Sequence, residues 1–274
     1  MSNGFRSAVL LAICWSGRSQ NCAAAAEVTP LPQAHAHNDY HHTTPLKDAL
    51  AHGFCSVEAD VFLVDGRLLV GHERSELDPD RTLERLYLDP LQERIRENRG
   101  RVFVQEAPFQ LLIDIKSGGP ETYRALDEVL ATYSELFTRV EEGSVHPGPI
   151  RVVISGNRDW PTITADTTRF AGIDGRLSDL GSDLPPHLLP WISDRWPSHF
   201  TWDGTGEIPA GEREKLTRIV QQAHREGRTV RFWATPESRE MREVLAAAGV
   251  DLINTDDLAG LRDFLLERAR PDTD

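Results

Sequence analysis

Residues 54–63 read Phe-Cys-Ser-Val-Glu-Ala-Asp-Val-Phe-Leu, an apolar and β-branched segment that carries two carboxylates. The composition predicts a buried β-strand, and because side chains alternate along a strand, Glu58 and Asp60 point to the same face. Two like charges on one buried face require a cation or strong hydrogen-bond donors between them. Carboxylate oxygens are the ligands that Mg²⁺ and Ca²⁺ prefer, so the segment predicts a divalent metal site.

Two histidines flank this strand in the sequence. His35 precedes it, and His72 follows it after an Asp65-Gly66 turn and a short return segment. Asp-Gly is a strong hairpin signal, so the return segment is expected to bring His72 back beside the end of the strand. Histidine titrates near neutral pH, and the two imidazoles are therefore candidates for a general acid and a general base.

A third acid lies on a second apolar strand, predicted over residues 110–115. Asp114 and Lys116 share one face of this strand because they are two residues apart. Asp114 is the third candidate metal ligand, and Lys116 is a candidate for balancing negative charge. A structural salt bridge between the two side chains explains the same pattern equally well.

Strand-like and helix-like segments alternate along the chain. Strands are expected to end near His35 and to occupy residues 54–63, 110–115, 150–155, 171–173, 188–192, 228–234 and 250–254, with helices over 44–52, 121–140, 212–225 and 238–248 and one or two more within 80–99. Alternating βα units in a chain of 274 residues predict a (β/α)₈ TIM barrel. An open doubly wound sheet is the alternative, although no glycine-rich loop follows the first strand.

Candidate functional residues gather at the carboxyl ends of these strands, which is where barrel enzymes place their active sites. The residues at strand ends are His35, Glu58, Asp60, Asp114, Asn157, Trp233 and Asn254. Their convergence predicts a single site.

The first residues have the pattern of a secretory signal. Arg6 is followed by a short apolar run over 8–15 and by four alanines over 23–26. Residues 1–26 are interpreted as a signal peptide, which predicts a secreted or periplasmic protein, with a disordered leader as the alternative. No linker or repeat divides residues 27–274, so a single domain is expected.

Charge and cysteine content restrict the partners and the chemistry. A formal net charge of −13 argues against a nucleic-acid partner, because phosphate backbones require a basic face. Cys55 is the single cysteine of the body, and its position in an apolar strand favours a small core residue over a nucleophile. No feature indicates an obligate protein partner.

Several motifs resemble the superfamily of glycerophosphodiester phosphodiesterases and phosphatidylinositol phospholipase C-like enzymes. They are His35 and residues 53–61, 65–72 and 112–116. Asn38, three residues after His35, is similar to the site spacing of sphingomyelinase D. A closer resemblance, over residues 35–40, 155–158, 174–176 and 192–202, is to the subgroup named after the fungal "altered inheritance of mitochondria protein 6"; the likeness runs from about residue 34 to 261.

The resemblance implies a TIM barrel that cleaves a phosphodiester with one divalent ion, Mg²⁺ or Ca²⁺. The implied ligands are Glu58, Asp60 and Asp114, and the implied catalytic residues are the acid–base pair His35 and His72, with Lys116 balancing the phosphate charge. The substrate class is a phospholipid head group or a related small diester, with transient contact to a membrane surface in the lipid case. Both hydrolysis and release of a cyclic phosphate are compatible with this chemistry.

Four further residues are candidates for contacting the substrate: Asn38, Asn157, Trp233 and Asn254. Each has a simpler structural explanation, because asparagines at strand ends satisfy backbone groups and tryptophans fill cores.

Two other classes of protein remain open. The His35-x-His37 pattern after a first strand is similar to the opening of two-metal amidohydrolases and phosphoesterases, which need more histidines at later strand ends, and the later strands carry none there. The second alternative is a non-catalytic barrel that binds a ligand without turnover.

Overall fold

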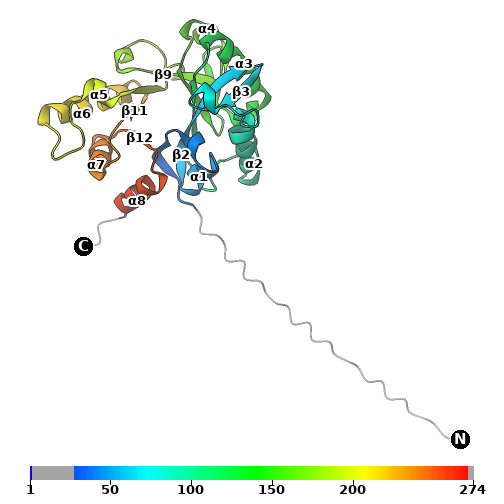
Figure 1. The fold of residues 1–274 in the computed structure, drawn as a ribbon, viewed down its shortest axis with the longest axis horizontal. Coiled ribbons are helices and arrows are strands. Elements are labelled where there is room, and N and C mark those ends of the chain that lie inside the picture. Colours follow the sequence, from blue (N-terminus) through cyan, green and yellow to red (C-terminus); the bar gives the residue numbers. More distant parts are fainter. Residues whose placement is uncertain (2–27, 271–274) are drawn as a thin grey trace.

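The computed structural model describes Met1 and residues 28–270. Eight parallel strands within residues 28–270 form a closed barrel (Figure 1). In sequence order the barrel strands are β1 (Leu31–Ala36), β2 (Phe54–Val64), β4 (Gln110–Ile115), β7 (Arg151–Gly156), β9 (Ala171–Gly175), β10 (Trp191–Arg195), β11 (Thr229–Trp233) and β12 (Leu252–Thr255). The first strand, β1, pairs with both β2 and β12, so the ring has no open edge. The predicted TIM barrel is confirmed, and the open sheet is excluded.

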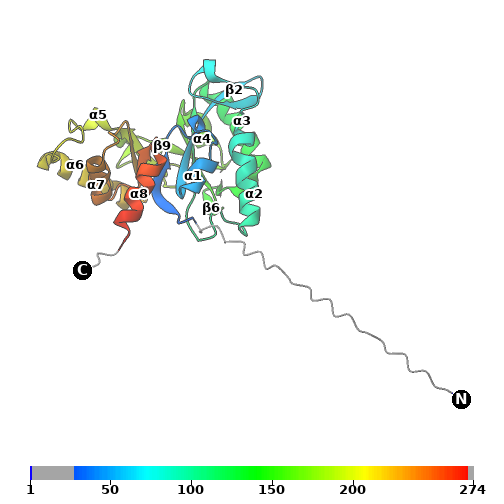
Figure 2. The same ribbon diagram turned by 60° about the horizontal axis from the view of Figure 1, so that its bottom comes forward.

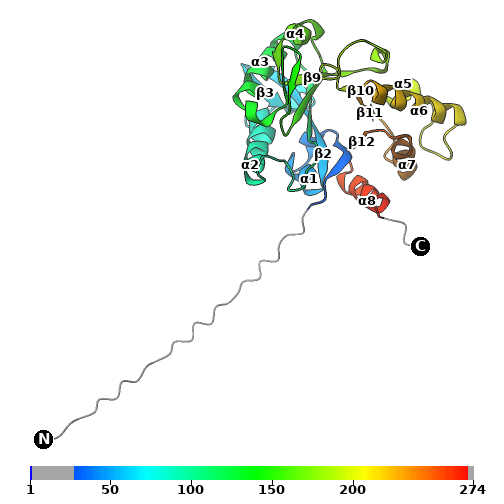
Figure 3. The ribbon, with the colours of Figure 1, turned by 180° about the vertical axis from the view of Figure 1, so that it is seen from behind.

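Helices surround the ring, with α2 to α4 on one side and α5 to α7 on the other in both Figure 1 and Figure 3. The helices are α1 (Lys47–Ala51), α2 (Asp89–Glu97), α3 (Gly119–Thr132), α4 (Trp160–Ala165), α5 (Trp196–His199), α6 (Ala210–Arg225), α7 (Arg239–Ala248) and α8 (Leu258–Arg268). Short helical turns are η1 (Asp39–His41), η2 (Arg74–Glu76), η3 (Glu84–Leu88), η4 (Ser134–Leu136) and η5 (Leu177–Asp179). Within residues 28–270 no helix has the combined length and apolarity of a membrane span. The predicted leader lies outside the described residues except for Met1, so export stays a prediction.

The predicted hairpin after β2 is present. Strand β3 (Arg67–Val70) runs antiparallel to β2. Asp65 and Gly66 both have positive φ, 49° and 76°, as a tight two-residue hairpin turn requires. The β2 label marks this end of the molecule at the top of Figure 2, while β6 (Ser144–His146) lies toward the bottom.

Side chains inside the barrel form an apolar layer with a polar layer next to it. Leu112, Val153, Trp191 and Leu252 make a buried cluster separate from the main core. Two residues further along the same four strands come polar side chains: Asp114, Ser155, Ser193 and Asn254. Because every second residue of a strand faces the same way, the apolar cluster closes the barrel beneath a polar mouth.

The outward faces of the strands pack under the helices. Val57, Ala59 and Val61 of β2 are completely buried in the main hydrophobic core, which lies between the ring and its helices. The predicted division of this strand, with acids on one face and apolar residues on the other, is therefore confirmed. Burial on both faces explains why the whole segment reads as apolar.

The helix predicted over 121–140 is wrong at its carboxyl end. Helix α3 stops at Thr132, and residues 139–141 instead form β5 (Arg139–Glu141), paired with β6 and with β8 (Thr168–Arg169). The turn Glu142-Gly143, with φ of 48° and 81°, joins β5 to β6 and is the local signal for this hairpin. Leu136 and Phe137 have helical spacing but reach the core from a short turn and an extended segment.

Other predicted boundaries shift by two or three residues. Strand β10 begins at Trp191 rather than at residue 188, because Pro190 cannot donate a ladder hydrogen bond. Helix α1 begins at Lys47 rather than at residue 44, since Leu46 has a φ of 62° that no helix accommodates. Thr44 does not cap it; the Asp48 carboxylate accepts hydrogen bonds from the Thr44 backbone N–H and hydroxyl. Strand β12 begins at Leu252, two residues later than predicted.

Candidate active site

A polar cavity of about 250 Å³ opens at the carboxyl ends of the barrel strands. It is lined by His37, Asn38, Glu58, Asp60, His72, Asp114, Lys116, Ser155, Gly156, Arg176, Arg231 and Trp233. A larger hollow of about 470 Å³ lies at the opposite, amino ends of the strands, where Gln33 and Phe109 line it together with four prolines. The titratable side chains converge on the smaller cavity, and this cavity is the candidate active site.

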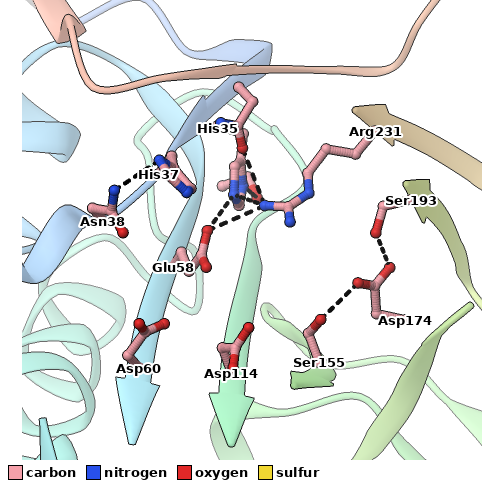
Figure 4. A network of polar contacts seen from close by, with 12 residues as sticks. His35, His37, Asn38, Glu58, Asp60, Asp114, Ser155, Asp174, Ser193 and Arg231 are labelled. Carbon is pink, nitrogen blue, oxygen red and sulfur yellow. Dashed lines mark hydrogen bonds and ion pairs between the residues drawn. The ribbon is translucent and has the colours of Figure 1, made fainter. Parts of the chain in front are cut away.

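The three predicted metal ligands meet in this cavity (Figure 4). One carboxylate oxygen from each of Glu58, Asp60 and Asp114 lies within 4.8 Å of the others. Burial raises the pKa of Asp114 to about 6, and burial together with the Glu58 charge raises the pKa of Asp60. Asp60 Oδ1 is buried and accepts no hydrogen bond from the described residues. This uncompensated negative charge fits a hard divalent cation.

Lys116 lies beside two of these acids. Its Nζ is 3.0 Å from Asp60 Oδ2 and 3.2 Å from Asp114 Oδ1. Burial opposes the charge of Lys116, but the two carboxylates outweigh it and raise its pKa. About a quarter of the side chain remains exposed, so the ammonium group is charged and accessible to an anionic ligand in the cavity.

His35 lies beneath the cavity and does not line it. The residue is 0% exposed, with Nδ1 2.7 Å from Ser56 Oγ and Nε2 2.7 Å from Arg231 Nη1. Burial and then the Arg231 charge lower its pKa to about 4. A neutral ring with both nitrogens engaged has no path to a substrate, so this geometry does not support the acid–base role predicted for His35.

Arg231 joins His35 to the acid cluster. Its Nη1 is 3.1 Å from Glu58 Oε2 and is within hydrogen-bond distance of His35. Burial opposes the charge of Glu58, but Arg231 and His35 outweigh it and hold the pKa of Glu58 well below its usual range. Glu58 is therefore ionised, and its Oε2 accepts a hydrogen bond from Arg231 beneath the cavity.

His37 does line the cavity, directly after β1. Its Nδ1 is 2.8 Å from Asp256 Oδ1, and the neighbouring Asn38 amide is 3.3 Å from the same oxygen. Burial would lower the pKa of His37, but the hydrogen bond to Asp256 and the charge of Glu58 raise it. In the part of the chain that the structure describes, no residue hydrogen-bonds Nε2. The Asp256 carboxylate thus orients the ring and leaves its other nitrogen available.

His72 reaches the cavity from the loop after β3, as the hairpin predicted. Its Nδ1 is 2.9 Å from Asp60 Oδ2, and the side chain is about half exposed. Tyr40 is buried beside it, with its hydroxyl 2.7 Å from Asp60 Oδ2 and 2.8 Å from Asn38 Oδ1. Burial and the Asp60 charge hold the pKa of Tyr40 far above its usual range, so the hydroxyl stays protonated.

The four predicted substrate contacts separate into two pairs. Asn38 and Trp233 line the cavity. Asn157 instead donates from its amide to the Ser117 carbonyl at 2.9 Å, and Asn254 accepts from Arg231 at 3.1 Å. Asn157 and Asn254 therefore hydrogen-bond to neighbouring protein groups and do not line the cavity.

Several lining or supporting residues were not predicted from the sequence. Arg231 stands at an inward position of β11, between the apolar residues Val230 and Phe232. A charged residue at the centre of such a strand is a usable signal for a functional site. Tyr40 and Asp256 gave no comparable signal, because their roles depend on contacts with residues 20 and 219 positions away.

Comparisons with known proteins find related phosphodiesterase domains. The profile of the AIM6-like phosphodiesterase domain matches residues 23–172, and that of the glycerophosphoryl diester phosphodiesterase family matches residues 229–259. "Altered inheritance of mitochondria protein 6" of Eremothecium gossypii is 30% identical, over 93% of this chain and 76% of that protein. Its homolog in Arthroderma benhamiae is 27% identical, over 86% of this chain and 84% of the relative.

A solved structure supports the fold. The glycerophosphodiester phosphodiesterase from Parabacteroides distasonis superposes with a TM-score of 0.52 at 14% identity, and the match covers 88% of this chain and all of that one. Both proteins thus share the barrel. Because the domain profile covers more than half of the sequence and the fungal relative aligns across nearly all of it, the chain belongs to the family of AIM6-like phosphodiesterase domains.

Proposed function

We propose that this chain is a metal-dependent phosphodiesterase that cleaves a small or lipid-derived phosphodiester by histidine acid–base catalysis. One observation carries the proposal: three carboxylates within 4.8 Å share a cavity with two histidines, His37 and His72. Each histidine uses Nδ1 to contact a carboxylate, and Nε2 is the nitrogen left for the substrate.

Glu58, Asp60 and Asp114 would hold one divalent ion, Mg²⁺ or Ca²⁺. Their oxygen ligands and the unpartnered Asp60 Oδ1 fit such an ion, and no histidine belongs to the cluster found among the described residues. When bound, a cation at this position supplies electrostatic stabilisation of the charge that develops on the phosphoryl oxygens. Lys116, beside two of the acids, binds a phosphoryl oxygen and keeps the diester against the cluster.

In the proposed mechanism one histidine is the general acid and the other is the general base. His37, whose pKa is raised by Asp256, holds a proton at Nε2 and delivers it to the leaving oxygen. His72 accepts the proton from the attacking hydroxyl through Nε2, while Asp60 and Tyr40 orient its ring. The attacking group is water or a hydroxyl of the substrate; the latter gives a cyclic phosphate first.

The amidohydrolase alternative has less support. It requires His35 and His37 to bind metal together, but His35 is completely buried and engaged by Ser56 and Arg231. His37 is held by Asp256, which lies outside the acid cluster. The pair therefore lacks the shared open side that a two-metal centre requires.

The test of the proposed function is a rate measurement with bis-p-nitrophenyl phosphate. We expect hydrolysis that a chelator suppresses and that either Mg²⁺ or Ca²⁺ restores, with about one ion bound per chain by metal analysis. Two tightly bound zinc ions per chain would favour the amidohydrolase alternative. A rate equal to that of a protein-free control would leave only the non-catalytic ligand-binding barrel.

Substitution of Gly156 by alanine is expected to weaken metal binding. Gly156 has a φ of 68°, and a Cβ there would overlap Asp114 Oδ1 and lie 2.5 Å from the Ile115 carbonyl oxygen. Displacing one ligand is expected to reduce Mg²⁺ affinity about tenfold, measured by calorimetric titration. Gly66→Ala is the matched control, since Gly66 has a φ of 76° but nothing within 4 Å of the added Cβ. Equal affinities in the two variants would contradict the proposed ligand role of Asp114.

A further inference from the structure

The cavity wall opposite His37 is basic and aromatic. In the closed ring β9 lies four strands from β1 in either direction, so residues that follow these two strands face each other across the mouth. His37 follows β1 directly and Arg176 follows β9 directly, and both line the cavity. A ligand whose reacting group contacts His37 therefore presents its other end to Arg176.

Arg176 is held rigidly from behind. Its Nη1 donates to Asp174 Oδ2 and to the Gly175 carbonyl, both at 2.9 Å. Asp174 is completely buried and accepts hydrogen bonds from the hydroxyls of Ser155 and Ser193 (Figure 4). Nη2 has only a 3.5 Å contact with Ser155 Oγ, and Nε has no acceptor within residues 28–270. One side of the guanidinium group is thus anchored while the other keeps free donors.

Arg231, on β11 and two strands away from β9, also has unused donors. Its side chain is 5% exposed, yet only Nη1 contacts acceptors, on His35, Glu58 and Asn254. Nε is buried without a partner, and no described residue accepts from Nη2. Buried guanidinium donors are rarely left without acceptors, so an arginine of this kind beside a cavity points to an anionic ligand.

Both arginines lie over the ring system of Trp233. The Cζ atoms of Arg176 and Arg231 are 4.8 Å and 5.7 Å from the centre of its ring system. Stacking on an aromatic face leaves the edge of a guanidinium group available for hydrogen bonds. The indole thus holds two like charges close together, which is favourable when an anion lies between or beside them.

The scissile phosphate does not account for this wall. A phosphodiester carries a single negative charge, and Lys116 together with the acid-cluster site on the other wall is positioned to bind it. Arg176 follows β9 and, among the described residues, contacts no member of the acid cluster. Arg231 on β11 contacts Glu58 through Nη1 alone, so its Nε and Nη2 stay unused. A neutral head group has no negative charge to pair with two guanidinium groups that keep free donors.

We infer that Arg176, Arg231 and Trp233 form a second anion subsite, and that the substrate carries a phosphate monoester on the head group in addition to the diester that is cleaved. This inference rests on the proposed function and narrows its substrate class. A phosphate monoester has three non-bridging oxygens and close to two negative charges, which match two guanidinium groups approaching from different strands. The cavity of about 250 Å³ restricts the second phosphate to the head group itself.

The test compares two substrates that differ only in that group, glycerophosphoinositol and glycerophosphoinositol 4-phosphate. We expect the wild-type protein to prefer the 4-phosphate about tenfold to a hundredfold in kcat/KM, and Arg176→Gln to lose most of that preference. Arg239→Gln is the matched control, because Arg239 also pairs with a carboxylate and lies over an aromatic ring, but on the outer helix α7. The control should keep the wild-type preference.

The outcomes separate this inference from the proposed function. Equal wild-type kcat/KM values for the two substrates would overturn the second subsite and leave the phosphodiesterase proposal intact. Absence of cleavage of either substrate and of bis-p-nitrophenyl phosphate, with metal present, would overturn the proposed function and the inference with it. Should Arg176→Gln fail to fold by circular dichroism, Trp233→Leu takes its place, and an undiminished preference in that variant would also overturn the subsite.

Discussion

Replacement of Asp60 by asparagine is expected to lower kcat/KM for bis-p-nitrophenyl phosphate by about a thousandfold or more, because several kcal/mol of charge stabilisation are lost and each 1.36 kcal/mol is a factor of ten. Asp60 is the acid with most contacts in the cavity: Lys116, His72 and Tyr40 all reach its Oδ2, and its Oδ1 is unpartnered. An amide keeps the shape but removes the charge. Calorimetric titration should show the parallel loss of Mg²⁺ or Ca²⁺ binding.

Stability distinguishes this effect from misfolding. Burial and the Glu58 charge raise the pKa of Asp60, which means that the ionised carboxylate is unfavourable in the folded, metal-free protein. Asp60→Asn should therefore unfold, in chelator, at a temperature no lower than that of the wild type. Asp80→Asn, at an exposed surface carboxylate paired with Arg85, is the control and should keep the wild-type rate. Near-normal kinetics in Asp60→Asn would remove the acid cluster from the mechanism.

The fold was predictable where the local pattern and the tertiary structure agree. Strand β2 combines apolar residues on one face with acids on the other, and the barrel uses both faces, so the prediction and the structure coincide. The end of α3 was not predictable in this way. Leu136 and Phe137 fulfil a helical spacing, but their burial comes from contacts with residues far along the chain, including the bridge between Phe137 and Ile150. Helical spacing alone does not distinguish residues buried on a helix face from residues buried by a turn and an extended segment.

The acids of the site were predictable for the same reason, since alternation along one strand determines their common face. The sequence did not predict which of His35 and His37 lines the cavity. Both fall near the end of β1, and their positions differ in depth: the strand ends at Ala36, so His37 reaches the cavity while His35 stays in the buried layer. That layer is completed by Arg231, 196 residues away, and a partner at such a distance leaves no trace in local spacing.

The buried contact between Arg231 and Glu58 keeps the Glu58 carboxylate ionised. An ionised carboxylate at this depth is unfavourable without compensation, and Arg231 Nη1, at 3.1 Å, provides it. His35, neutral because its pKa is lowered to about 4, fills the space beside the pair without adding a second positive charge. The negative charge of Glu58 in the folded state is thus maintained by its buried neighbours, while the charges of Asp60 and Asp114 depend on what occupies the cavity.

Alanine substitution of His37 is expected to lower kcat by about 10²- to 10⁴-fold on a diester with an alkyl alcohol as leaving group, because the proton that this alcohol needs is lost. The loss should be much smaller on bis-p-nitrophenyl phosphate, since p-nitrophenolate departs without protonation. His72→Ala should lower the rates on both substrates, because removing the proton from the attacking hydroxyl is required in either case. Steady-state kinetics on the two diesters measures both contrasts.

His35→Ala is expected to give the opposite result, and it decides between the two histidines at the carboxyl end of β1. Loss of a completely buried ring, with its contacts to Ser56 and Arg231, is expected to lower the free energy of unfolding by about 2–4 kcal/mol. His37→Ala should cost less stability, because its ring lines an open cavity. The rate loss in His35→Ala should show no dependence on the leaving group, since no proton passes through that ring. A leaving-group dependence that appears in His35→Ala and is missing in His37→Ala would return the acid role to His35, because only the histidine that protonates the departing oxygen can distinguish an alcohol from p-nitrophenolate.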